Sequence, residues 1–271
     1  DHPFKYDISA NLSTLRNRVT SLGFGTESYI TGAYATYVGK EIGKFYGWVY
    51  EGIARTQSDI DNHATQQGAN VGDCLYKDIS GPNGEPDGVI DAYDQTVLGS
   101  GLAKMNFGLS AHMEYKGFDL SISTYGALNY HVADDIYNSL NSCYGWGNKD
   151  VAMADANRFS EDGSTYLSNV PRTYATNNAT LAWNDLFSSR KIQNAAYWKI
   201  ANVELGYNFP DRWFKGLVSG VRAYVSAQNL YTFTGYKGYN VDYAGGTFTP
   251  GYNFCSFPSA RSFMAGLHFT F

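Results

Sequence analysis

Several features are scarce in this 271-residue sequence, and each scarcity argues against a class of protein. Only 17% of the residues are charged, the formal charge is -5, and no basic run occurs, so no nucleic-acid partner is expected. No apolar run approaches the length of a membrane-spanning helix. Strands that cross a membrane would escape this test, because their apolar residues alternate with polar ones.

Cysteines and catalytic motifs are also scarce. Cys74, Cys143 and Cys255 are far apart and odd in number, which predicts small buried or loop thiols instead of a disulfide framework or a metal-binding pair. The five histidines show no metal-ligand spacing, and no nucleophile elbow, phosphate-binding loop or dinucleotide fingerprint occurs. The sequence therefore predicts a protein that is not an enzyme.

Abundant glycine (29) and tyrosine (23) accompany a clear alternation of apolar and polar residues. In residues 105 to 115, for example, Met105 and Phe107 lie on one face of the predicted strand, and Asn106 lies on the other. Residues 43–52 predict a further strand with a blurred pattern. The other alternating segments are residues 4–13, 118–130, 201–209, 221–228 and 262–271. Such lengths exceed the usual strand of a soluble sandwich and suit a tilted membrane strand of about nine to eleven residues.

The connections between these strands alternate in length. Short links at Lys116-Gly117 and at residues 210–216 alternate with long ones at residues 131–191 and 234–258. In outer-membrane barrels, short turns face the periplasm and long loops face outward. The sequence therefore predicts an all-β fold, an antiparallel transmembrane β-barrel whose large extracellular loops include residues 56–104 and 131–191. The competing interpretation is a large soluble β-sandwich with one polar face.

Aromatic residues near the predicted strand ends fit the interfacial girdle of such a barrel. These residues are Tyr115, Phe118, Phe209, Trp213 and Phe214. The last alternating strand ends at Phe271, which the same topology places at the periplasmic end. Simple core packing would explain any one of these rings.

The stretch NGEPDGVIDAYD has the spacing of a calcium-binding loop. Gly88 falls where such a loop turns sharply, and Ile90 is placed to plug the loop into a small core. Asp78 is an alternative first ligand, with residues 81–86 bulged out. The predicted Ca²⁺ ligands are Asp78 or Asn83, then Glu85, Asp87, the Val89 carbonyl, Asp91 and Asp94. A plain turn rich in aspartate, asparagine and glycine would give the same composition.

Aromatic residues in the predicted loops are candidates for stacking on sugar rings, although they equally fit loop packing. They are Tyr144, Trp146, Trp183, Tyr236, Tyr239 and Tyr243. Together with the calcium loop, they support an alternative function as a secreted or surface calcium-dependent carbohydrate-binding module. Detergent dependence separates the two hypotheses, because only the barrel would need detergent to stay in solution.

Five motifs in order resemble the C-terminal end of SusC/RagA-type proteins, the TonB-dependent outer-membrane transporters of the Bacteroidota. They are VGKEIGKFYGWVYEGI, GDCLYKDISGPNGEPDGVIDAYDQTVLG, YWKIANVELGYNFP, AQNLYTFTGYKGYNVD and FPSARSFMAGLHFTF, and the resemblance covers nearly the whole chain. Family members carry a compact stretch resembling KDLNGDGVIDDND where this chain has KDISGPNGEPDGVIDAYD. The carry-over of calcium-type ligands is direct from Asp87 to Asp94 and open between Asp78 and Asn83.

The resemblance implies a function in nutrient import. It places residues 1–271 in the C-terminal part of a receptor barrel in the bacterial outer membrane, with no plug domain in the sequence. The implied cargo is an oligosaccharide, another glycan or a peptide. The implied partners are a SusD-like surface lipoprotein, outer-membrane lipid, and TonB acting through the absent N-terminal plug region. The Ca²⁺ would be structural.

Overall fold

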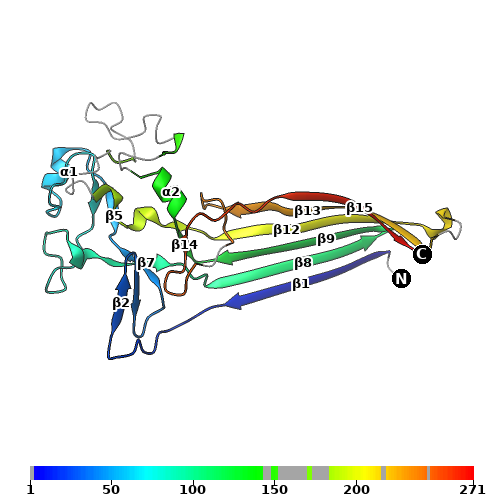
Figure 1. Cartoon of the computed structure of the whole chain (residues 1–271), viewed down its shortest axis with the longest axis horizontal. Helices are drawn as coiled ribbons and strands as arrows, with labels where there is room; N and C mark the ends of the chain where they lie inside the picture. The colour runs from blue at the N-terminus through cyan, green and yellow to red at the C-terminus, as the bar shows by residue number, and fades with distance from the viewer. Residues whose placement is uncertain (1–2, 143–147, 152–169, 173–182, 215–217, 243–244) are drawn as a thin grey trace.

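The computed structural model describes residues 3–142, 148–151, 170–172, 183–214, 218–242 and 245–271, and antiparallel strands dominate it (Figure 1). Six long strands form the main sheet, and every neighbouring pair is antiparallel. In spatial order they are β1 (Phe4–Thr14), β8 (Met105–Tyr115), β9 (Phe118–Leu128), β12 (Tyr197–Phe209), β13 (Gly220–Thr234) and β15 (Ser262–Thr270).

The alternation in the sequence located these six strands. β8 coincides with the predicted residues 105–115, and the turn to β9 consists of Lys116 and Gly117. Both turn residues have positive φ angles, 47° and 88°, which is the conformation that a two-residue hairpin requires. β9 ends at Leu128, two residues earlier than predicted, because Asn129 leaves the strand with a φ of 57°. The hairpin prediction is confirmed.

β12 begins at Tyr197, four residues before the alternation predicted it. The register between β12 and β9 shifts at Ile200/Asn202, where β12 carries one residue more than its partner. A bulge of this kind reverses which residues face each side of the sheet. On one side of the bulge, Val203 lies on the same face as its partner Ile122. On the other side, that face continues with Ile200, which pairs with Thr124, and not with Ala201. Because the alternation changes phase at the bulge, a search for a two-residue period missed the first four residues of the strand.

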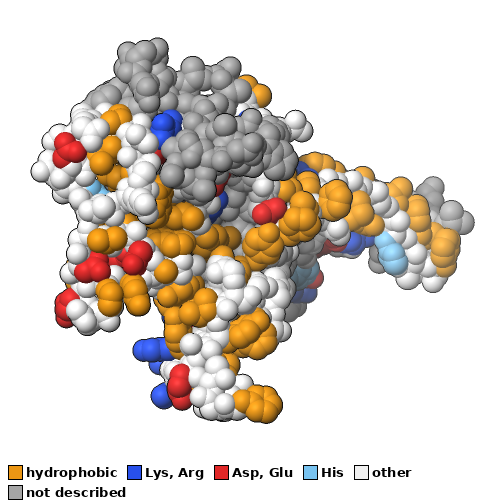
Figure 2. Space-filling model, turned by 60° about the vertical axis from the view of Figure 1, so that its left-hand side comes forward, with side chains coloured by type: hydrophobic (Ala, Val, Ile, Leu, Met, Phe, Trp, Pro, Cys, Tyr) orange, Lys and Arg blue, Asp and Glu red, His pale blue; other side chains and the backbone are white. Residues whose placement is uncertain are grey.

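The main sheet has one apolar and one polar face, in register across its strands. One apolar line runs Ala111, Ile122, Val203, Ala227 and Phe263. The neighbouring polar line runs Ser9, Ser110, Ser123, Asn202, Gln228 and Ser262. Because side chains alternate across a strand, the two lines face opposite sides of the sheet. No described segment of the chain covers the apolar side, and Ile8 and Leu267 are 62% and 63% exposed there. Figure 2 shows hydrophobic side chains along the exposed surface of these strands.

The other described strands form smaller sheets at one end of the long strands (Figure 1). A four-stranded sheet holds β2 (Ser28–Thr31), β3 (Tyr34–Tyr37), β4 (Lys44–Gly47) and β7 (Thr96–Ser100). A two-stranded sheet holds β5 (Tyr50–Ile53) and β6 (Cys74–Tyr76), and a three-stranded sheet holds β10 (His131–Asp134), β11 (Gln193–Asn194) and β14 (Tyr252–Asn253). The single strand predicted at residues 43–52 was therefore wrong. It is two short strands, β4 and β5, in different sheets, which explains its blurred pattern.

The helices whose bounds are described are short and lie in the connections. They are α1 (Gln57–Asp61), α2 (Asp135–Leu140) and the 3-10 turns η1 (Ala92–Asp94), η3 (Ser189–Lys191) and η4 (Asp211–Trp213). Within the described ranges, no helix is both long enough and apolar enough to span a membrane.

The long connections all leave the same end of the main sheet. The described residues of 15–104, 129–196 and 235–261 lie at that end, whereas both termini and the two short turns lie at the other (Figure 1). The buried core is also at the loop end, in three clusters around Val132, Phe45 and Tyr76. Aromatic rings gather at the turn end instead, where Phe209 lies 5.8 Å from Trp213 and Tyr207 lies 4.6 Å from Phe118. The predicted alternation of short and long connections is confirmed.

Candidate functional site

The stretch with calcium-loop spacing lies at the loop end, between β6 and β7. Gly88 has a φ of +83°, as its place in a sharp turn requires. Ile90 is 3% exposed and packs in the cluster of Cys74 and Tyr76, as the sequence predicted. A bridge between Thr65 and Val89 ties the loop to the preceding segment. The apolar plug therefore holds one side of the loop against a small core.

Asp94 closes this loop with its carboxylate. Its side chain is fully buried, and Oδ1 accepts hydrogen bonds from the backbone N–H groups of Ile79 (2.7 Å) and Ser80 (3.1 Å). Its Oδ2 accepts from the backbone of Asp91 at 2.8 Å. These three backbone donors satisfy both oxygens of the Asp94 carboxylate. Asp94 is thus the residue that draws the two ends of the loop together.

The carboxylate of Asp78 has one oxygen available as a metal ligand. Its Oδ2 accepts from the backbone N–H of Gly88 at 2.7 Å, and its Oδ1 is buried with no hydrogen-bond partner among the described residues. A buried oxygen without a donor is costly and is a common sign of an ion or a water. In the described part of the chain, however, no group of three or more acidic, histidine or cysteine side chains is close enough to hold a metal ion.

The other predicted ligands are spread along the loop. Asp87 and Asp91 accept hydrogen bonds from the backbone of nearby residues, Val89 at 3.0 Å and Tyr93 at 2.7 Å. Asn83 and Glu85 are exposed. The structure therefore brings Asp78 and Asp94 into the body of the loop and leaves Asn83 and Glu85 at its surface.

The predicted substrate-stacking aromatics divide into three groups. Tyr236 is 6% exposed, and its hydroxyl donates to Asp134, so its ring packs in the core. Trp183 packs 6.1 Å from Tyr76, and its Nε1 donates to the Gln67 carbonyl. Tyr239 is 60% exposed. Tyr144, Trp146 and Tyr243 lie outside the described residues.

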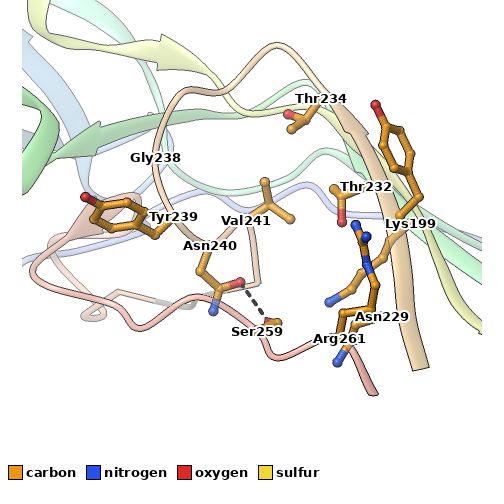
Figure 3. A pocket seen from close by; sticks show the side chains of 11 residues that line it. Lys199, Asn229, Thr232, Thr234, Gly238, Tyr239, Asn240, Val241, Ser259 and Arg261 are labelled. Carbon is orange, nitrogen blue, oxygen red and sulfur yellow. Dashed lines mark hydrogen bonds between the residues drawn. The ribbon is translucent and has the colours of Figure 1, made fainter. Parts of the chain in front are cut away.

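Tyr239 lines a pocket of about 330 Å³ between the loop ends of the main strands and the connection that follows β13. Lys199, Thr232 and Thr234 come from β12 and β13, on the polar face of the sheet. Figure 3 shows Thr232 and Arg261 on one side of the pocket and Tyr239 and Asn240 on the loop opposite, with the Tyr239 ring turned away from Thr232 and Arg261. The remaining lining residues are Asn229, Tyr231, Gly238, Val241 and Ser259.

A buried ion pair supports one wall of this pocket. Lys199 is 3% exposed, and its Nζ donates to Asp242 Oδ2 at 2.6 Å. The Tyr125 hydroxyl donates to the same oxygen at 2.9 Å. Burial acts to raise the pKa of Asp242, but the hydrogen bonds from Lys199, Tyr197 and Tyr125 outweigh it and hold that pKa below its usual value. The pair therefore stays ionised at neutral pH.

Sequence reasoning missed Lys199, Arg261 and Asp242. Lys199 lies in the part of β12 that precedes the bulge, where the alternation changes phase. Once the phase is reversed, Lys199 is assigned to the polar face, in line with Tyr125 and Thr232. That reassignment was the one signal in the sequence that pointed to a cation on this wall.

Comparisons with known proteins identify similar chains. No family profile matches this sequence. The chain is 27% identical to TonB-dependent receptor P3 of Formosa agariphila and 25% identical to TonB-dependent receptor SusC of Bacteroides thetaiotaomicron, over 99% of its own length in each case. A solved structure of the RagAB peptide transporter matches with a TM-score of 0.76 and 21% identity, over 99% of this chain and 27% of that one. The chain spans 27% of P3 and 24% of SusC.

Proposed function

We propose, from the confirmed resemblance of this chain to SusC/RagA-type TonB-dependent transporters, that it forms part of the wall and the outer loops of an outer-membrane barrel that imports nutrients. The observation that carries this proposal is the two-faced main sheet. Its apolar side is uncovered across six strands, while its polar side holds serine, asparagine and charged residues in register. An apolar outside and a polar inside are what a transport barrel in lipid needs.

The same face argues against the soluble carbohydrate-binding module. Soluble proteins rarely leave large contiguous apolar surfaces in water. On this chain the apolar side chains of β1, β13 and β15 are exposed together, including Tyr6 (68%), Val225 (55%) and Phe263 (70%). β1 and β15 are the edges of the sheet and do not pair with each other, so the six strands do not close a barrel. Further strands must close it.

The proposed partners follow from the proposed place in the membrane. The long loops would face outside and meet a SusD-like lipoprotein, and TonB would supply energy through a plug inside the barrel. The cargo would be a glycan or a peptide. The names of the similar proteins describe receptors and a peptide transporter, which is consistent with a non-enzymatic role.

Uptake assays on the source bacterium test this function. Deletion of the gene is expected to abolish growth on, or uptake of, particular fluorescent oligosaccharides or peptides, and deletion of tonB is expected to give the same loss. Purification from the outer membrane in detergent is expected to recover a lipoprotein with the protein. Normal uptake of every oligosaccharide and peptide in the panel, or recovery of the protein as a detergent-independent soluble species, would contradict the proposal.

We also propose that the loop of residues 78–94 binds Ca²⁺ with Asp78 as its first ligand and Asp87 among the others. The buried, unpaired Oδ1 of Asp78 supports this assignment over Asn83, which is exposed. Calcium takes six to eight oxygens and would neutralise a loop crowded with carboxylates. When bound, it would hold the loop by charge neutralisation, in addition to the plug made by Ile90.

Limited proteolysis tests the calcium proposal. Chelation is expected to speed cleavage within residues 78–94 severalfold, and added Ca²⁺ is expected to reverse the effect. Asp78→Asn is expected to remove the dependence on Ca²⁺. Asp61→Asn, which changes an exposed aspartate of α1, is the matched control and is expected to retain it. Equal cleavage with and without chelator would rule out Ca²⁺ binding by this loop.

A further inference from the structure

The pocket beside Lys199 and Arg261 has a one-sided charge. Among its described lining residues there are two cations, Lys199 and Arg261, and no carboxylate. Lys199 is neutralised by Asp242, which lies behind the wall and accepts its hydrogen bond at 2.6 Å. Arg261 has no hydrogen-bond or ion-pair partner among the described residues. One uncompensated positive charge therefore remains at the pocket.

Neutral donors surround that charge. The side-chain oxygen of Asn240 accepts from the backbone N–H of Asp242 at 2.9 Å and from the Ser259 hydroxyl at 3.5 Å (Figure 3). These contacts fix the amide with its nitrogen left to donate. Thr232 adds a hydroxyl from the wall that faces Asn240. In the described structure, neither the Asn240 nitrogen nor the Thr232 hydroxyl has a protein partner.

The pocket also lies where cargo would pass. Lys199 and Thr232 are paired across β12 and β13 on the polar face of the sheet, which is the inner face in the proposed barrel. They lie at the loop end, which would be the outer mouth. A volume of about 330 Å³ is at the small end of ligand pockets and suits one residue or one sugar unit of a longer molecule.

We propose that this pocket binds a carboxylate of the imported molecule, with Arg261 as the charged anchor and Asn240 and Thr232 as neutral donors. This inference rests on the proposed import function and specifies its substrate class. A planar carboxylate matches the fork of a guanidinium with two parallel hydrogen bonds, and one free cation balances one negative charge. The carboxylate is either the C-terminus of a peptide or the acid group of a uronic sugar.

Binding to the purified full-length protein tests the pocket with two matched pairs of probes. One pair is a short alanine peptide with a free C-terminus and its C-terminal amide. The other is trigalacturonic acid and its methyl ester. We expect the acid of at least one pair to bind about tenfold or more tightly than its neutral partner, since a charge-assisted hydrogen bond is worth about one such factor. The pair that shows the difference identifies the source of the carboxylate.

Two variants assign the effect to the pocket. Arg261→Gln removes the charge with little change in length, and it is expected to bring acid and neutral probes to equal affinity while leaving the neutral probe within about twofold of wild type. Arg212→Gln makes the same change in the short turn at the far end of the strands and is expected to keep the preference. Equal wild-type binding of acid and neutral probes, or a preference that survives Arg261→Gln, would overturn the carboxylate site. Uptake that stays normal when the gene or tonB is deleted would instead count against the import function.

Discussion

The main sheet and the loop end of this molecule differ in whether they bury their apolar side chains. Along the main sheet, apolar residues such as Ile8 and Val225 are left exposed, and the described sheet has no apolar layer over them. At the loop end, Phe45, Val132 and Tyr76 are fully or almost fully buried by short strands and loops. In the proposed barrel, the sheet would therefore depend on surrounding lipid, whereas the loop end carries its own core.

The polar side chains of the main sheet and of the loop end also form different kinds of network. On the sheet, Arg222 joins Asp119 and Glu204 across three strands on the polar face. At the loop end, Asp73 is fully buried and joins segments about a hundred residues apart, because Arg172 donates to both of its oxygens. The sheet network lies on the face that would line the proposed barrel, and the loop-end network holds distant segments of the chain together. Substitutions should separate these roles.

Removing Asp73 is expected to have the largest effect. Its carboxylate also accepts from Asn184 at 2.8 Å and from the backbone of Asn70 at 2.9 Å. Asp73→Ala would remove the buried carboxylate of this ion pair, and breaking a buried pair by removing one member costs about 3–5 kcal/mol. We expect rapid hydrogen exchange throughout β5 and β6, measured by mass spectrometry, with the main sheet unchanged. Asp61→Ala, at an exposed aspartate, should change exchange little. Uniform loosening of sheet and loops would refute the independence of the two regions.

A positive charge introduced on the apolar face is expected to destabilise the main sheet instead of the loop end. Leu205 is 44% exposed in the middle of β12, between Leu120 and Val225. Leu205→Arg is expected to destabilise the protein by about 2–4 kcal/mol in lipid, because arginine near the bilayer midplane has that cost. Asn202→Arg, on the polar face of the same strand, should cost much less. Urea unfolding in vesicles measures both, and equal losses would invalidate the assignment of faces.

The difference between the regions also decided what the sequence could predict. Alternation is a local signal, so it located β8 within its true bounds and assigned both faces of the sheet. It failed in β12, where a bulge changes the phase, and at residues 43–52, where two short strands follow each other. The pair of Asp73 and Arg172 spans 99 residues and leaves no local pattern at all.

The candidate sites follow the same rule. The spacing of Gly88 and Ile90 was enough to predict a sharp turn and a buried plug, because both are properties of a short segment. The pocket combines Lys199 and Arg261, which are 62 positions apart in the sequence (261 minus 199). Only the folded sheet brings them together. The aromatic ring of Tyr236 was predicted as a stacking platform, and the fold places it in the core.

Tyr236 offers a smaller test of the loop-end core. Its hydroxyl donates to Asp134 and accepts from the Asn253 side chain at 2.9 Å. Tyr236→Phe removes one hydrogen bond to a buried carboxylate and is expected to cost about 1.5–3 kcal/mol. Thermal unfolding of the loop end, followed by near-ultraviolet circular dichroism, measures the loss. Tyr239→Phe, at a ring that is 60% exposed, is the control and should leave the transition unchanged.

Acidification should give the smallest effect, confined to the wall of the pocket. The pKa of Asp242 is lowered in the folded protein, so its contribution to stability is complete above its ordinary unfolded value of about 4 and is lost as the pH falls through the lower folded value. Hydrogen exchange of residues 238–242, corrected for the intrinsic rate, is expected to stay constant from pH 7 to pH 5 and to increase below pH 4. Asp242→Asn should be unprotected at every pH and lose this dependence. A transition near pH 6 in that segment would mean that Lys199 and Asp242 are not the pair that holds it.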